Sequence, residues 1–163
     1  TFGHTMTGPS WREGHGDLIS VCFCAEVGAV RAALIAVDAS LQEKGIDRDL
    51  RDRAQIALAE ACNNIVEHAY PVGDTIKAMI GLDIADDRGG LQITLRDRGL
   101  PMPDGQLPGI AWPAIDPDDP LTLPEGGFGW PLLHGMAQAL CLSRQSGQNI
   151  LRFHLPRIAT HRQ

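Results

Sequence analysis

The stretch from Gly99 to Gly126 limits what this chain can fold into more than any other part of the sequence. It holds seven of the eleven prolines and shows no hydrophobic period. Proline lacks the amide hydrogen that helices and central strands need, so we predict one long loop here. A loop of this length inside a domain is usually a functional lid or a disordered segment. The regular elements must therefore come from the residues on either side.

Two amphipathic helices are predicted before this loop. Apolar residues recur every three or four positions from Val27 to Leu41, and Lys44 with Gly45 provides the usual end of a helix. A second helix is predicted to begin at the N-cap Asp47 and to end before Pro71. The apolar residues of its packed face are Leu50, Ala54, Ala57, Leu58, Ala61 and Ile65.

Alternating apolar residues predict the strands. We expect a first strand at 17–24, a hairpin of 76–84 and 91–95 with its turn at 86–90, and a closing hairpin of 139–145 and 149–155. A third helix is expected to begin near Phe128. These elements favour an α/β two-layer sandwich with helices on one face of a mixed, mostly antiparallel sheet.

Composition excludes two classes of function. The chain has 163 residues and 44% hydrophobic content, which suits a single domain over residues 6–163, with Thr1–Thr5 ahead of Met6 expected to lie outside the fold. A net charge of −6 argues against nucleic-acid binding. No apolar run approaches the roughly 20 residues of a membrane-spanning helix, and no signal segment is recognised, so we expect a cytoplasmic protein.

The four cysteines form no C-x-x-C pair and are expected to be reduced.

A polar stripe marks the end of the second predicted helix. Glu60, Asn64 and His68 follow one another at intervals of four, which places a carboxylate, an amide and an imidazole on one helix face. Such a set can supply a general base, an oxygen ligand for a hard cation and a donor to phosphate. The alternative is a solvated helix face with polar i,i+4 contacts.

A second candidate site lies where a predicted strand ends. Asp97 falls on the same side of that strand as Ile93 and Leu95, so its carboxylate should point toward the core. A buried carboxylate needs a partner, and the exocyclic amino group of adenine would be one. Gly99 would leave room for a flat base. The alternative is a turn formed by Asp97 and Gly99.

A glycine-rich segment precedes the third predicted helix. Gly127 and Gly129 flank Phe128, and Pro131 suits a first helical turn. Glycines let the backbone approach a phosphate, and a helix N-terminus offers free N–H groups. The segment lacks the Lys-Ser/Thr ending of a P-loop and is not followed by a parallel Rossmann-like unit, which excludes both of those sites.

The order of these features resembles the nucleotide site of the GHKL ATPases. The helix stripe, the inward Asp-x-Gly, the long loop and the Gly-x-Gly correspond to their N-box, first G-box, lid and second G-box. The chain looks most like the anti-sigma-factor serine-protein kinases of the RsbW type. Their characteristic stretches are similar to Ala59 through Asn64, His68-Ala69-Tyr70, Asp97-Arg98-Gly99 and Pro124 through Gly129. The resemblance implies a Bergerat-type ATP-binding fold with a lid at about 99–126.

The resemblance implies catalytic roles on the helix stripe. Glu60 would be the base that takes the proton from a serine or threonine hydroxyl. Asn64 would give its amide oxygen to Mg²⁺, which would keep waters and phosphate oxygens as its other ligands. His68 would contact a phosphate or cap the site.

The resemblance also implies how ATP would be held. Asp97 would bind the adenine amino group, and Gly99 would shape the floor of the pocket. Gly127 and Gly129, with Phe128 between them, would hold the phosphates.

The activity implied is that of a serine/threonine-protein kinase that phosphorylates a STAS-type antagonist in a partner-switching pathway. The family also implies a sigma factor as a partner and a homodimer. One alternative is a nucleotide-dependent protein-binding module with weak or no catalysis, because no Lys or Arg lies between Gly99 and Gly126. Another is a detached histidine-kinase catalytic domain, which is disfavoured because no helical hairpin with a phospho-acceptor histidine stands ahead of the predicted ATP site.

Overall fold

The helices and strands follow the predicted order. The computed structural model describes residues 18–70, 78–102, 105, 107 and 129–159. The elements are β1 (Ile19–Cys24), α1 (Val27–Glu43), α2 (Arg48–Asn64), the π-helical turn η1 (Ile65–Ala69), β2 (Met79–Asp87), β3 (Gly90–Asp97), α3 (Gly129–Met136), β4 (Gln138–Gln145) and β5 (Gln148–Pro156). The five strands form one sheet in the order β1-β2-β3-β5-β4, and each pairing between these strands is antiparallel.

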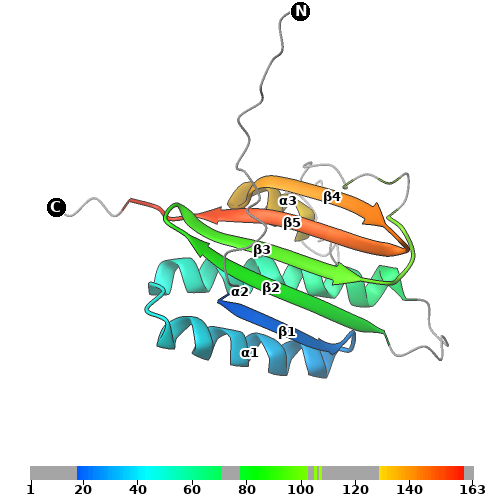
Figure 1. The fold of residues 1–163 in the computed structure, drawn as a ribbon, viewed down its shortest axis with the longest axis horizontal. Helices are drawn as coiled ribbons and strands as arrows, with labels where there is room; N and C mark the ends of the chain where they lie inside the picture. Colours follow the sequence, from blue (N-terminus) through cyan, green and yellow to red (C-terminus); the bar gives the residue numbers. More distant parts are fainter. Residues whose placement is uncertain (1–17, 71–77, 103–104, 106, 108–128, 160–163) are drawn as a thin grey trace, which may run out of the picture.

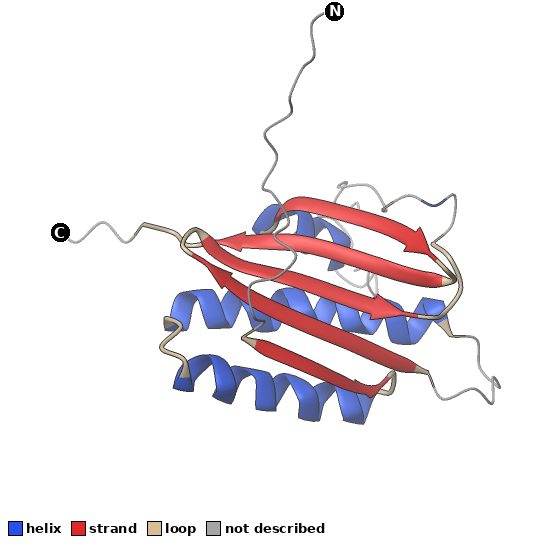
Figure 2. Ribbon diagram, viewed as in Figure 1, coloured by secondary structure: helices blue, strands red, loops and turns tan. Residues whose placement is uncertain are grey.

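The sheet and the helices form two layers. Figure 1 shows α1 and α2 side by side behind the sheet, with α3 behind β4 and β5. Figure 2 shows that these helices all lie on the same face of the sheet. The predicted two-layer α/β fold is therefore confirmed. The described strands make antiparallel pairs throughout, so the parallel pairing that a mixed sheet allows is not part of this sheet.

The core lies between these two layers. Its largest fully buried side chains come from both: Leu41, Leu50, Leu58, Ile80, Leu82, Ile84, Leu91, Ile93, Leu95, Leu133, Phe153 and Leu155. The strand register brings inward apolar residues opposite one another, as in the row of Ile84, Ile93 and Phe153. The last inward position of β3 is Asp97, which lies opposite Asn149 of β5. The apolar rows thus end in a polar pair.

The ends of the helices agree with the predicted caps. The Asp47 side chain accepts a hydrogen bond of 2.9 Å from the backbone nitrogen of Leu50, and Gly45 has a φ of 77° beyond the end of α1. Val27 was predicted on the buried face but is 70% exposed. It begins α1, and side chains lean toward the helix N-terminus, so it projects beyond the packed turns. Within the described residues, no helix has the length and apolar character needed to cross a bilayer.

The first hairpin has a shorter turn than the predicted residues 86–90. Because β2 runs to Asp87 and β3 begins at Gly90, the turn consists of Arg88 and Gly89. The Asp87 carboxylate accepts hydrogen bonds from the Gly89 nitrogen at 2.9 Å and from Gln92 at 2.9 Å, and lies 3.1 Å from His154 Nε2. Burial acts to raise the pKa of Asp87, but the hydrogen bonds from His154 and Gln92 outweigh it and lower that pKa below its ordinary value.

The second hairpin turns close to where its sequence predicts. Ser146 and Gly147 connect β4 to β5 and have positive φ angles of 51° and 74°. Two residues with positive φ suit a two-residue hairpin turn.

Thiol labelling tests the packing of α2 on the sheet. Cys62 is fully buried on α2, and burial raises the pKa of its thiol to about 12, whereas Cys22 and Cys141 are exposed. Because the thiolate is the reactive form, iodoacetamide at about pH 8 should alkylate Cys22 and Cys141 in the native protein and spare Cys62. Peptide mass spectrometry reads the result, and urea-unfolded protein, in which all thiols react, is the control. Equal alkylation of Cys62 and Cys22 in the native protein would contradict this packing.

Candidate nucleotide-binding site

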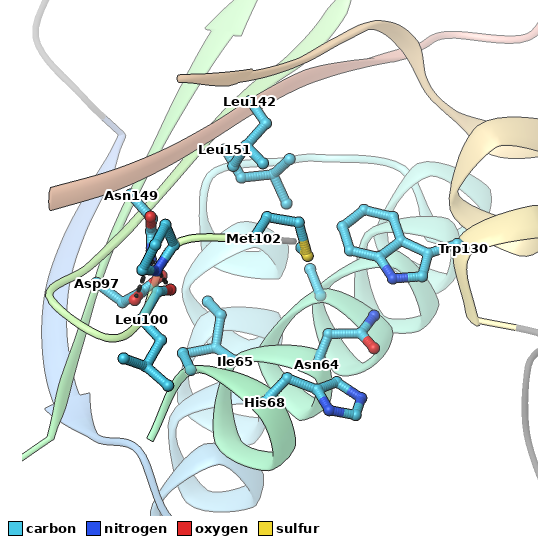
Figure 3. A pocket seen from close by; sticks show the side chains of 13 residues that line it. Asn64, Ile65, His68, Asp97, Leu100, Met102, Trp130, Leu142, Asn149 and Leu151 are labelled. Carbon is cyan, nitrogen blue, oxygen red and sulfur yellow. Dashed lines mark hydrogen bonds between the residues drawn. The ribbon is translucent and has the colours of Figure 1, made fainter. Parts of the chain in front are cut away.

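A cavity of about 60 Å³ lies beside the end of α2, between that helix and the sheet. Its apolar lining consists of Ala61, Ile65, Ala69, Leu100, Pro101, Met102, Trp130, Leu142 and Leu151. Its polar lining consists of Asn64, His68, Asp97 and Asn149. In Figure 3, Asp97 and Asn149 lie at one end of the cavity and Trp130 at the other. A mostly apolar cavity with a few placed polar groups is the usual form of a small-molecule site.

The Asp97 carboxylate belongs to the wall of this cavity. Asp97 is 6% exposed, as its inward position in the alternation predicts. Its Oδ1 accepts hydrogen bonds from the Gly99 backbone nitrogen at 2.8 Å and from Asn149 Nδ2 at 2.9 Å. Both donors contact the same oxygen, and no described residue donates to Oδ2. A carboxylate oxygen in a mostly apolar cavity is stabilised by a donor, so Oδ2 is suited to a ligand amino group.

The π-helical turn begins after the second residue of the predicted polar stripe. The sequence predicts one helix up to Pro71, but the regular helix ends at Asn64 and η1 follows. Asn64 and His68 both line the cavity, and His68 is a rim residue whose side chain is 67% exposed. Glu60 precedes Asn64 by one turn of the regular helix and does not line the cavity.

Gly129 brings the third motif against the first. A Cβ atom added at Gly129 would lie 2.4 Å from Glu60 Oε2 and 3.7 Å from Asn64 Nδ2. Any other residue would displace the Glu60 carboxylate, so the glycine allows the first residue of α3 to reach α2. Gly127, Phe128 and most of the predicted lid lie outside the described residues.

The structure gives a reason for glycine at position 99 that the sequence did not indicate. A Cβ atom at Gly99 would lie 2.4 Å from the backbone oxygen of Ala69 and 2.5 Å from its Cβ. The next residue, Leu100, donates its backbone N–H to the same Ala69 oxygen at 2.7 Å. Gly99 itself does not line the cavity. The space beside it is occupied by η1, so it does not leave room for a base as predicted.

Sequence reasoning missed two residues of the site, Asn149 and Arg144. Asn149 is 8% exposed, and its Nδ2 donates to Asp97 Oδ1 and to the Leu100 backbone oxygen, both at 2.9 Å. Its Oδ1 accepts a hydrogen bond of 2.7 Å from Arg144 Nη1. A usable signal existed, because Asn149 is a polar residue at an inward position of an alternating strand. The same signal identifies Asp97 as a candidate site residue.

Tyr70 connects the end of η1 to the start of β2 and to the residue that follows β3. Its hydroxyl oxygen accepts a hydrogen bond of 2.9 Å from the Arg98 nitrogen and donates to the Met79 oxygen at 3.4 Å. Burial raises the pKa of Tyr70 above its ordinary value. The phenol therefore stays protonated at neutral pH and can donate its hydrogen to the Met79 backbone oxygen.

The side chains near α3 fit a nucleotide with Mg²⁺. The Asn64 side chain lies beside the first residue of α3, since its Nδ2 is 3.7 Å from the position of a Cβ on Gly129, and the same amide carries one neutral oxygen. A helix N-terminus provides free N–H groups for phosphate. Mg²⁺ takes few ligands from proteins and keeps waters and phosphate oxygens for the rest. A single amide is therefore a sufficient protein ligand for a metal that arrives with the nucleotide.

Known proteins resemble this chain in sequence. A family model described as a histidine kinase-like ATPase domain matches residues 23–155. The serine-protein kinase RsbW of Oceanobacillus iheyensis is 26% identical over 136 residues, which cover 83% of this chain and 84% of that protein. RsbW of Halalkalibacterium halodurans is 30% identical over 122 residues, covering 74% of this chain and 70% of that protein.

A solved structure shares the fold. The crystal structure of the RsbU and RsbW domains of a Mycobacterium tuberculosis protein aligns with a TM-score of 0.54 at 18% identity. The alignment covers 86% of this chain and 33% of that longer one. At this identity the likeness concerns the fold alone.

The contact between Gly99 and η1 can be tested by substitution. Gly99→Ala should lower the free energy of unfolding by about 1–3 kcal/mol, because overpacking forces backbone shifts of that cost. Urea denaturation measures the change. Gly28→Ala in α1 is the matched control, since a Cβ there meets nothing within 4 Å, and it should be neutral or stabilise by up to about 1 kcal/mol. An unchanged stability for Gly99→Ala would mean that the loop and η1 do not pack this closely.

Proposed function

Because this chain belongs to the histidine kinase-like ATPase family, with RsbW serine-protein kinases among its relatives, we propose that it is an ATP-dependent serine/threonine-protein kinase and anti-sigma-type regulator. Its proposed substrate is a STAS-type antagonist protein in a partner-switching pathway, with a sigma factor as a second partner. One observation carries the proposal: three motifs far apart in the sequence converge. Gly129 lies against Glu60 and Asn64, and Asp97 shares a cavity with Asn64.

The cavity provides the proposed adenine site. Asp97 Oδ2 accepts the exocyclic amino group of the base, while Oδ1 remains bonded to its two protein donors. Ile65 on the helix side and Leu142 and Leu151 on the sheet side give apolar surface for the faces of the ring (Figure 3). Burying an aromatic base against such surface is favourable, and the single acceptor sets its orientation.

Phosphoryl transfer takes place at the start of α3 in this proposal. The substrate hydroxyl oxygen forms a bond to the γ-phosphorus as the bond between that phosphorus and the β,γ-bridging oxygen breaks, and ADP leaves. Glu60 accepts the hydroxyl proton, and its half-buried carboxylate lies against Gly129, where a helix N-terminus favours phosphate. Bound Mg²⁺, held by the Asn64 amide oxygen, would neutralise phosphate charge.

A nucleotide-dependent protein-binding module is the second candidate. The sequence between Gly99 and Gly126 contains no Lys or Arg to contact a γ-phosphate, which favours this module over an efficient kinase. In that case ATP or ADP would set the shape of a partner-binding surface without transfer.

Glu60→Gln tests the kinase assignment. Labelled Mg-ATP and STAS-domain proteins encoded near the gene should give an acid-stable phosphoprotein with the unaltered protein. The variant should lose transfer by about a hundredfold or more, because it lacks the general base, while ATP binding is kept. Glu43→Gln, at an exposed side chain at the end of α1, is the matched control and should transfer normally.

Two outcomes separate the candidates. Normal transfer by Glu60→Gln would remove Glu60 from the catalytic role. ATP binding without transfer to any of these proteins would favour the binding module, and an acid-labile product would indicate histidine phosphorylation instead.

Asp97→Asn tests the adenine site. The Gly99 nitrogen and Asn149 Nδ2 both donate to Oδ1, so the new amide must keep its oxygen there and turn its NH₂ toward the cavity. A donor then opposes the adenine amino group and matches the 6-oxo group of inosine. ADP affinity should fall about tenfold or more, and IDP should bind more tightly than ADP, as measured by calorimetry. Asp52→Asn, whose side chain is 66% exposed, is the control. If Asp97→Asn kept the ADP preference, the carboxylate would not contact the base.

A further inference from the structure

We propose that Arg144 is a positioning residue for nucleotide recognition, which holds both donors of the Asp97 carboxylate and thereby sets the preference for an amino group on the base. This inference rests on the proposed ATP-binding function. It assigns a role in base selectivity to a side chain of the terminal hairpin that does not itself line the cavity.

Three residues lie in one row across neighbouring strands. Arg144 of β4 is opposite Asn149 of β5, and Asn149 is opposite Asp97 of β3. Hydrogen bonds run along this row, from Arg144 Nη1 to Asn149 Oδ1 at 2.7 Å and from Asn149 Nδ2 to Asp97 Oδ1 at 2.9 Å. The Asn149 side-chain amide thus bridges the Arg144 guanidinium and the Asp97 carboxylate.

Arg144 also holds the second donor. Its Nη1 donates to the Gly99 backbone oxygen at 3.1 Å, and the Gly99 nitrogen is the other donor to Asp97 Oδ1. One guanidinium nitrogen therefore contacts each of the two residues that bind the carboxylate. Removing it would loosen both hydrogen bonds to Oδ1 together.

The Asn149 amide has little freedom in this arrangement. Its NH₂ group donates to two acceptors, Asp97 Oδ1 and the Leu100 oxygen, and its own oxygen accepts from Arg144. An arginine can only donate, so it selects the orientation in which the amide oxygen faces it. Oδ1 of Asp97 is then always paired with an N–H group, and Oδ2 is the oxygen that remains for the ligand.

The opposite side of the same loop is held by the end of η1. Leu100 donates its N–H to the Ala69 oxygen at 2.7 Å, and Arg98 donates its N–H to the Tyr70 hydroxyl at 2.9 Å. The segment from Arg98 to Leu100 is therefore fixed on the helix side by other groups. On the side of the sheet, the segment is held by the hydrogen bond from Arg144 to the Gly99 oxygen.

Arg144 suits a test of function because the fold depends little on it. It is exposed and belongs to β4, an edge strand of the sheet, whereas Asp97 and Asn149 are buried. Removing the hydrogen bonds of Arg144 should therefore change ligand selectivity more than the stability of the core.

The experiment compares ADP with IDP, which differ at position 6 of the base. Arg144→Met keeps the length of the side chain and removes its donors. ADP affinity should fall about tenfold, as expected if the charged hydrogen bond between the adenine amino group and Asp97 Oδ2 is lost, while IDP affinity changes by less than about twofold. The ADP/IDP affinity ratio should therefore fall about tenfold, and Arg144→Lys should restore part of it. Arg48→Met, at a side chain that is 86% exposed at the start of α2, is the matched control.

The outcomes distinguish a failure of the positioning role of Arg144 from a failure of the proposed ATP-binding function. A merely structural role would weaken ADP and IDP equally, so an unchanged ratio in Arg144→Met overturns the positioning role while the ADP preference of the unaltered protein stands. If the unaltered protein binds neither nucleotide, the proposed function is overturned as well. Thermal unfolding is measured for each variant, and Arg144→Leu, which also lacks donors, replaces Arg144→Met if the latter is not folded.

Discussion

Two hydrogen bonds to a single oxygen of Asp97 connect most parts of the candidate site. A buried carboxylate is costly unless it is paired, and here the donors come from the loop after β3 and from the start of β5. Through them the end of β3, the Gly99–Leu100 segment and the terminal hairpin are held in one arrangement. Both donors contact Oδ1, so among the described residues none donates to Oδ2 of this cavity-lining residue. The pairing that stabilises the buried carboxylate and the proposed base recognition thus concern the same group.

The remaining walls depend on backbones that approach where glycine has no side chain. Gly99 lies against Ala69, and Gly129 lies against the Glu60 carboxylate. These two contacts bring the end of α2 next to the loop after β3 and next to α3. In the proposed function, base recognition and transfer are separated in space. The proposed base recognition concerns Asp97 and the apolar cavity, whereas the proposed transfer step concerns Glu60, which lies outside the cavity lining.

Local patterns predicted the elements well because they depend on residues close in sequence. The capping of α2 by Asp47 and the turn at Ser146 and Gly147 follow from the preferences of single residues for particular backbone shapes. The inward position of Asp97 follows from alternation with period two. The helical pattern up to Pro71 did not indicate that the regular helix ends at Asn64, because apolar periodicity does not mark a π-helical turn such as η1.

The sequence by itself determined the helices, the alternating strands, the two-layer class and the inward carboxylate. Only the tertiary structure decided which groups complete the site. Asn149 and Asp97 are 52 residues apart and Arg144 and Gly99 are 45 apart, and they meet because β5 lies between β3 and β4 in the sheet. Strand order is set by the packing of the whole core against the helices. No local period records it, so the partners of Asp97 could not be read from spacing.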